Sequence, residues 1–334
     1  MFNKLYIKIK EILKNEPILS YIIIILIMIN FIRLPYYING TGGIVPLDKK
    51  IIIENEYKNK GSFNIAYVSE YKANLYTLLY AWLNPNYDII PKSEYLNTTD
   101  TDNTMNYRDN LELTSSLDNA LYVSYIKAGE FISIESNDIY VTYILDGAIT
   151  DIEVGDKILK VNDIPVLTKD DVSNIINTLN KDDDVTFDVY NKKDIKRHGK
   201  VLETDNYKYV GLYLTEDTKY KVDRNIKFKF DHNESGPSGG LMVALEIYNS
   251  INDVDITKGY TIAGTGTIDK MGNVGSVAGI KYKLRGASKA GAKVFLVPLD
   301  NLEEALYEKE LNNYNINVVA VSTFNDALKY LDSL

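Results

Sequence analysis

The residues best suited to chemistry lie in a Gly-Pro-Ser-Gly-Gly turn that opens an apolar stretch. Ser238 is the serine of this turn, Gly236 opens it, and Gly239 follows the serine, in the segment FKFDHNESGPSGGLMVALEIYNSI. At the start of the helix expected there, backbone N–H groups and the helix dipole can stabilise an oxyanion, and Gly239 lets a substrate backbone approach. Serine also caps helices without any catalysis, so the turn alone leaves both interpretations open.

A serine hydroxyl needs a base, and the sequence offers a lysine 43 residues downstream. Lys281 follows Gly279 at the start of another predicted helix. A lysine serves as a base when burial or a nearby positive potential lowers its pKa. Lys283 lies about 200° further round the helix axis, so both lysines cannot point into one site. A solvated surface charge is the alternative for either lysine.

Composition excludes several other chemistries. The chain of 334 residues has no cysteine and only two histidines, His198 and His232, so neither a zinc site nor a Cys nucleophile is expected. We predict no metal and no cofactor. A Ser-His-Asp triad using His232 and Asp231 is conceivable, but an extended FKFDH strand would carry His232 away from the serine. The net charge of -9 argues against nucleic acid as a partner.

The elements around these residues predict more than one folded unit. From residue 205 onward, strands (TIAGTGTI, AKVFLVP, INVVAVS) alternate with helices, which is typical of an α/β or α+β domain. Residues 38–90 are predicted to form strands, and a long helix is expected to end at Gly129. Residues 132–204 form a strand-and-turn unit with one clear helix, which Thr168 is expected to cap.

An uncharged apolar segment lies near the N-terminus. It runs from Pro17 to Ile32 and extends through aromatic residues to Tyr37, so residues 17–37 are predicted to be a transmembrane anchor. Residues 1–16 contain four lysines and are expected to be cytoplasmic, which places the rest of the chain outside the cell. A cleaved signal peptide and a buried core helix are the alternatives.

Four segments taken together resemble the proteolytic domain of the Lon family. They are GPSGGLMVAL, TGTI, AGIKYKL and GAKVFLVP, in the family's order. The resemblance implies an α+β, α/β-like fold for residues 205–334, with Ser238 as nucleophile, Lys281 as general base and Thr265 orienting the lysine. The segment LELTSSLDNALYVSYIKAG is similar to the family's upstream helix, so residues 38–130 are expected to belong to the same protease lobe. Ser235 departs from the Asp that bacterial ATP-dependent members often carry there.

Residues 131–204 resemble a PDZ domain, which implies a small β-barrel-like sandwich with helices. The resemblance rests on the run IYVTYILDGAITDIEVGDKILKVNDIPVLTKDDVSNIINTL. PDZ domains bind an extended peptide beside an exposed strand. Asp138, Ile139 and Tyr140 stand where such domains hold the peptide carboxylate, and are the predicted peptide-binding residues. We expect this unit to be inserted into the protease lobe; a rigid spacer is the alternative.

The combined pattern is similar to membrane-bound PDZ/Lon-like proteases of Gram-positive bacteria. No GxxxxGK[ST] motif occurs, so no nucleotide is expected as a partner. The sequence predicts an ATP-independent serine endopeptidase, single-pass in the cell membrane and facing outward, that cuts extended peptides or unfolded proteins. Its expected partners are these substrates and membrane lipid, with a homo-oligomer left open. A catalytically inactive PDZ scaffold and a peptide-capturing chaperone are the alternatives.

Overall fold

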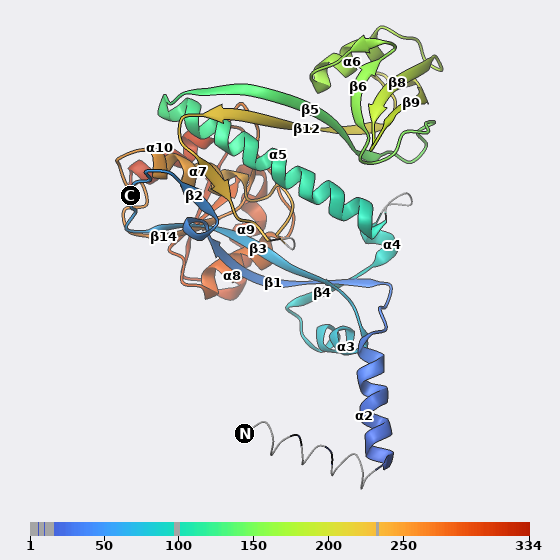
Figure 1. Cartoon of the computed structure of the whole chain (residues 1–334). Helices are drawn as coiled ribbons and strands as arrows, with labels where there is room; N and C mark the ends of the chain where they lie inside the picture. Colours follow the sequence, from blue (N-terminus) through green and yellow to red (C-terminus); the bar gives the residue numbers. More distant parts are fainter. Residues whose placement is uncertain (1–5, 7–9, 11–16, 97–100, 232–233) are drawn as a thin grey trace. The chain divides into compact units, whose positions relative to one another are not determined.

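The computed structural model describes the chain except for residues 1–5, 7–9, 11–16, 97–100 and 232–233 (Figure 1). It divides into two compact units. The first comprises Met1–Thr41 and Ser69–Leu96, and the second comprises Gly42–Val68 and Asn97–Leu334. Strands β1 (Tyr36–Pro46) and β3 (Ser62–Lys72) each contribute residues to both units.

The part of the first unit that the structure describes contains three helices and a strand pair. The helices are α2 (Pro17–Asn30), α3 (Leu75–Leu83) and α4 (Lys92–Tyr95), and the first part of β1 pairs antiparallel with β4 (Tyr87–Pro91). Helix α3 begins at a capping box, in which the Asn74 side chain accepts from the backbone of Thr77 and the Thr77 hydroxyl contacts the backbone N–H of Asn74. A small core around Ile38 holds the unit together.

The predicted membrane anchor differs from the helix that forms. Helix α2 has 14 residues and ends at Asn30, and Tyr36 and Tyr37 belong to β1. Pro35 disfavours a helical conformation at the residue before it and cannot donate a helical hydrogen bond, which accounts for the change to a strand. Among the described residues, we find no helix with the length and apolar character needed to cross a bilayer.

The second unit is built on a sheet whose central strands are parallel. Strand β14 pairs with both β3 and β17, and β17 pairs with β18. The bounds are β14 (Thr261–Gly264), β17 (Val294–Pro298) and β18 (Asn317–Val321). The helices that contribute to the cores on this sheet are α5 (Asp102–Ala128), α7 (Gly240–Ile251), α8 (Ile280–Lys289), α9 (Leu302–Asn312) and α10 (Phe324–Asp332). Those of these elements that follow residue 205 confirm the strands and helices expected there.

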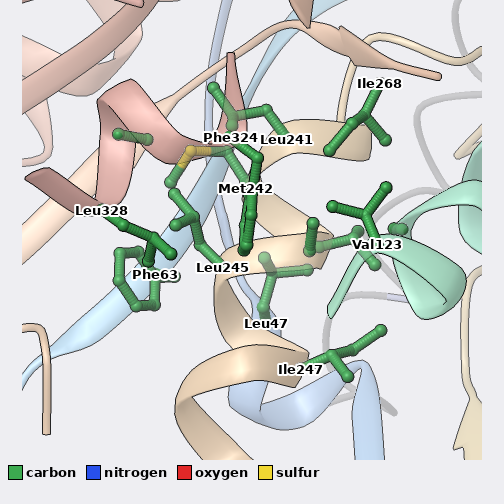
Figure 2. Close-up of a cluster of buried hydrophobic side chains, with 14 of the residues drawn as sticks. Leu47, Phe63, Val123, Leu241, Met242, Leu245, Ile247, Ile268, Phe324 and Leu328 are labelled. Atoms are coloured by element: carbon green, nitrogen blue, oxygen red, sulfur yellow. The ribbon is translucent and has the colours of Figure 1, made fainter. Parts of the chain in front are cut away.

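Successive residues of the strands point into two different cores. In β17, Leu296 joins the core formed by α5, α7 and α10, whereas its neighbour Phe295 joins the core formed by α8 and α9. The sheet therefore has helices on both faces. Helix α7 is buried almost all round, as its apolar sequence requires. Figure 2 shows its own Leu241, Met242 and Leu245 in one cluster with side chains from other elements, such as Val123 of α5 and Phe324 of α10.

A second sheet has the order β12-β5-β6-β8-β9 and its own core. Its strands are β5 (Ile132–Ile144), β6 (Lys157–Val161), β8 (Asp184–Tyr190), β9 (Asp194–Lys200) and β12 (Leu212–Val222), with the two-residue β7 (Ile164–Pro165) beside β6. Helix α6 (Lys169–Asn177) is capped by Thr168, as predicted. The sheet continues through β12 to Val222, beyond the boundary expected at residue 204.

Short elements complete the second unit. They are the 3-10 turns Leu47–Lys49 and Leu299–Asn301 and the strand pairs β2 (Ile51–Ile53) with β13 (Ile226–Phe228), β10 (Leu202–Glu203) with β11 (Lys208–Tyr209), and β15 (Thr267–Ile268) with β16 (Val274–Gly275). Helix α5 precedes the second sheet in sequence and α7 follows it, yet both share one core, and the Ser124 hydroxyl of α5 lies 2.8 Å from the Ala244 carbonyl of α7. In the sequence, the strands of the second sheet thus lie between two helices that belong to one core.

Candidate active site

The turn that carries Ser238 is fixed from both sides. Helix α5 holds it through the Ser116 hydroxyl, which donates to the Pro237 carbonyl at 3.0 Å. The backbone N–H of Gly266, just after β14, donates to the Ser238 carbonyl at 2.7 Å. The serine therefore sits between the sheet and the buried helix α7, a position that leaves its backbone little freedom.

The glycines of this turn serve close packing and turn geometry. A Cβ on Gly239 would come within 2.6 Å of the Ile65 Cδ1 atom, so this position faces β3 and not open space for a substrate backbone. This corrects the expectation that Gly239 provides the approach for substrate. Gly236 has φ +85°, the left-handed conformation that glycine adopts without strain, and its own Cβ direction is open.

Lys283, and not Lys281, reaches the serine. The Lys283 Nζ atom lies 3.0 Å from Ser238 Oγ and 3.1 Å from Thr265 Oγ1, and the residue is 4% exposed. The Lys281 Nζ atom instead lies 4.9 Å from the centre of the Tyr282 ring. The prediction that Lys281 pairs with Ser238 is therefore wrong. The structure agrees with the argument that only one of the two lysines can face the site.

The helix periodicity explains why Lys283 is the buried lysine. Helix α8 starts after Gly279, whose left-handed φ of +76° sets the first turn. Its buried face then contains Ile280, Leu284 and Ala287, at the i, i+4 and i+7 positions of one stripe. Lys283 falls at i+3 of the same stripe. This apolar pattern is visible in the sequence and could have identified the correct lysine.

Burial changes the acid–base chemistry of this amine. Removal from water disfavours the charged form and lowers the pKa of Lys283 to about 8 from its ordinary 10.5, while the negative charge of Glu304 acts in the opposite direction. At pH 7 about a tenth of the molecules then carry the neutral amine. A neutral amine 3.0 Å from a serine hydroxyl can accept its proton.

Thr265 connects the two other side chains. It is fully buried directly after β14, and its hydroxyl donates to the Ser238 carbonyl at 2.9 Å while accepting from Lys283 Nζ. One hydroxyl thus contacts both the serine backbone and the lysine amine. The structure brings Ser238, Lys283 and Thr265 into a single hydrogen-bonded cluster.

Two backbone donors beside the serine lack partners in the described part of the chain. The N–H groups of Gly240 and Leu241 donate to carbonyl groups of Pro237 and Gly266. Among the described residues, no hydrogen bond is donated by the N–H of Ser238 or Gly239. Both groups stand at the beginning of α7, where the helix dipole adds positive potential.

Neither a histidine triad nor a metal site emerges from the described residues. His232 lies outside them, and the adjacent Asp231 accepts from Lys50 Nζ at 2.7 Å. Glu234 is bound by the same amine, also at 2.7 Å. Within the described ranges, no group of three His, Cys, Asp or Glu side chains is arranged to hold a metal ion.

The predicted peptide-binding residues occupy an interior strand. Ile139 and Tyr140 of β5 pair with β12 on one side and with β6 on the other, and Ile139 is buried. Asp138 forms an ion pair with Lys157 at 2.6 Å. A peptide cannot be added beside a strand that is already paired on both sides, so the prediction for Asp138, Ile139 and Tyr140 is wrong. The strands at the two ends of this sheet's order are β12 and β9, and helix α6 contacts β12.

A cavity of about 580 Å³ lies between β12 and the serine turn. Residues of α5, the start of α6, β12 and the segment 268–271 line it together with Pro237. Two of the lining residues form an ion pair: Lys270 Nζ lies 2.9 Å from Glu216 Oε2 of β12. Glu216 Oε1 also accepts a hydrogen bond from the backbone N–H of Lys169. The cavity thus borders β12, one edge of the second sheet, and Pro237, the residue before the candidate nucleophile; Ser238 itself is not among its lining residues.

The C-terminal third of the chain matches known proteases. Residues 231–331 match the family described as Lon protease (S16) C-terminal proteolytic domain. The chain is 35% identical to the Lon protease of Campylobacter jejuni over 99 residues, 29% of this chain and 12% of that protein. It is 33% identical to Lon protease 2 of Bacillus subtilis over 93 residues, 28% of this chain and 16% of that protein. It is 28% identical to the archaeal Lon protease of Archaeoglobus fulgidus over 96 residues, 29% of this chain and 15% of that protein.

These matches define what the C-terminal third is. It carries a Lon-type (S16) proteolytic domain, which is a serine-type peptidase domain, on a mixed α/β fold. The matched stretch contains the whole Ser238, Thr265 and Lys283 cluster. The chain spans only 12% to 16% of the length of these three relatives.

Proposed function

We propose that the protein is a serine endopeptidase in which Ser238 is the nucleophile and Lys283 is the general base. The observation that carries this proposal is the burial of Lys283 with its amine 3.0 Å from the serine hydroxyl. A solvated lysine would stay protonated at neutral pH and could not accept a proton. The Lon-type proteolytic domain in the same residues supports peptide hydrolysis as the reaction.

The proposed reaction begins with the neutral amine of Lys283. The amine removes the proton from Ser238 Oγ as the oxygen attacks the scissile carbonyl, and the N–H groups of Ser238 and Gly239 receive the oxyanion. When the peptide C–N bond breaks, the Lys283 ammonium returns the proton to the leaving amine. Water, deprotonated by the same lysine, then attacks the acyl-enzyme ester; as the ester C–O bond breaks, the Lys283 ammonium returns this proton to Ser238 Oγ and the new carboxylate is released. Thr265 keeps the lysine directed at the serine throughout.

We further propose that the enzyme works without ATP and on extended chains. The sequence has no phosphate-binding GxxxxGK[ST] motif, so unfolding power would have to come from elsewhere. Extended or unfolded peptides reach a fixed serine without prior unfolding. The edge of β12 is the place where such a peptide adds to the second sheet, in the manner of PDZ domains. The cavity beside Pro237 supports a route from this edge to the serine.

The enzyme is also proposed to be held at the outer face of the cell membrane by its N-terminal segment. Helix α2 consists of uncharged residues and exposes isoleucine, leucine and methionine side chains on all sides, and lysines precede it in the sequence. Apolar surface of this kind is stabilised by lipid, and lysines favour the cytoplasmic side. An inactive peptide-binding scaffold remains the competing function.

The test is cleavage of an unfolded protein by the full-length chain in lipid vesicles. Casein is incubated with the protein and with Ser238→Ala, with and without ATP, and new termini are identified by mass spectrometry. We expect cleavage by the parent alone, independent of ATP. Equal cleavage by both proteins would reject Ser238 as nucleophile. Casein binding without cleavage by either would favour the scaffold.

A further inference from the structure

Helix α3 in the first unit exposes an unusual amount of apolar surface. Its nine residues, LYTLLYAWL, contain no charged side chain. Trp82 is 73% exposed, Leu83 69%, and Leu79 and Tyr80 54% each. Large apolar side chains occur singly on most protein surfaces, but here they follow one another along a single helix. This concentration calls for a partner.

Most of the exposed side chains share one side of α3. At 100° per residue, Leu75, Leu79, Trp82 and Leu83 fall within an arc of about 100°, Tyr76 borders it, and Tyr80 lies about 60° beyond the same end. The opposite side carries Ala81, which is buried in the core of the first unit. The capping box at Asn74 fixes where the helix begins. The apolar side is therefore held outward by packing and does not result from a loosely attached helix.

The apolar surface of α3 continues onto that of α2. The Tyr76 hydroxyl donates to the Leu26 carbonyl at 2.6 Å, and Asn74 Nδ2 donates to Asn30 Oδ1 at 2.8 Å. The start of α3 thus lies against the last turns of α2. Helix α2 exposes a run of large apolar side chains, namely Ile18, Tyr21, Ile22, Ile23, Ile24, Ile25, Leu26, Ile27 and Met28.

The composition of the two helices identifies the partner. Neither helix contains a charged residue that could form an ion pair with a protein surface. The aromatic residues of α3, namely Trp82, Tyr76 and Tyr80, are the types that concentrate where a bilayer meets water. Four lysines precede α2 in the sequence, at positions 4, 8, 10 and 14, and suit anionic lipid headgroups. These features together fit a lipid surface better than a second protein.

We propose that α3 inserts its apolar side into the interfacial layer of a lipid bilayer, next to α2. The protein then contacts the membrane through two helices that touch each other, and not through a single N-terminal segment. A second contact restricts how the first unit can tilt and rotate at the membrane, since a lone helix permits rotation about its own axis. This inference does not depend on the peptidase reaction.

Trp82 provides the test, because it is the only tryptophan in the chain. The full-length protein is reconstituted into phosphatidylcholine–phosphatidylglycerol vesicles, with or without lipids brominated at carbons 6 and 7 of one acyl chain. Bromine quenches nearby indole emission, whereas acrylamide quenches indole that is exposed to water. We expect brominated lipid to remove at least half of the Trp82 emission, and acrylamide quenching to fall several-fold relative to free tryptophan.

A matched control moves the reporter away from α3. The double variant Trp82→Tyr, Tyr213→Trp places the single tryptophan on β12, where the tyrosine is 57% exposed. Brominated lipid should leave the emission of this control tryptophan unchanged, whereas acrylamide should quench it. The proposal is overturned if Trp82 behaves like the control reporter, or if the protein fails to float with vesicles.

A second copy of the chain is the competing occupant, and dilution separates it from lipid. In nanodiscs that hold one protein each, lipid insertion predicts unchanged quenching of Trp82 by brominated lipid. If Trp82 becomes accessible to acrylamide when copies are separated, the apolar side of α3 binds another chain and the proposal is wrong. The measurement uses no activity, so it stands or fails separately from the peptidase proposal.

Discussion

Raising the pH from 7 to 9 is expected to increase kcat/KM for peptide hydrolysis about tenfold. The active form carries Lys283 as the neutral amine, and burial lowers the pKa of this amine to about 8. The neutral fraction is then about 9% at pH 7 and about 91% at pH 9. Activity should therefore rise with pH, with a slope near one on logarithmic axes below pH 8, and level off above it.

Glu304→Gln supplies the matched perturbation. The negative charge of Glu304 raises the pKa of Lys283, so its removal should shift the pH profile toward lower pH and increase activity at pH 7. The assay is initial-rate cleavage of a fluorogenic casein-derived peptide by parent and variant between pH 6 and 9.5. A profile that is flat across this range, or a shift toward higher pH in Glu304→Gln, would refute the assignment of Lys283 as the base.

Three further substitutions follow from the same geometry. Thr265→Val keeps the shape but loses both hydroxyl contacts, so kcat should fall by about tenfold or more in steady-state assays. Gly239→Ala places a Cβ against Ile65 and should lower the free energy of unfolding, measured with denaturant, by about 1–3 kcal/mol. The double variant Gly239→Ala, Ile65→Val should regain this stability, and no gain would contradict the contact. Burial of the charged Lys283 amine destabilises the folded state; this penalty is fully present below pH 8 and disappears as the pH rises to about 10.5. Lys283→Met removes the penalty, so the free energy of unfolding at pH 7 should increase by about 3 kcal/mol. An unchanged free energy of unfolding would exclude the lowered pKa.

Local patterns in the sequence predicted most of the protease core. The apolar runs that became β14, β17 and β18 and the buried helix after Ser238 could be recognised from composition and period alone. The lysine was misassigned because Lys281 was matched to the family's motif at the helix start, with its spacing from Ser238, and the apolar stripe of the helix was not considered. Lys283 lies on the buried face with Ile280 and Leu284, and this three-residue pattern carries the information.

Long-range pairing could not be derived from the sequence in the same way. The strand that covers one side of β5 is β12, and the paired residues Ile139 and Glu216 are 77 positions apart. Nothing local in β5 shows that its edge is already occupied, so Asp138, Ile139 and Tyr140 were expected to be available to a peptide. The extent of α2 was likewise overestimated, since Pro35 and the pairing of β1 with β4 end the helical segment before Tyr36.

The most direct test of the proposed dyad compares two lysines that are two residues apart. Lys283→Met and Lys281→Met make the same chemical change on one helix, but only the first removes the amine that contacts Ser238 Oγ. Casein cleavage at pH 8.5 should fall by about 1,000-fold or more in Lys283→Met and stay within about twofold of the parent in Lys281→Met. Full loss in Lys281→Met with activity retained in Lys283→Met would contradict the account.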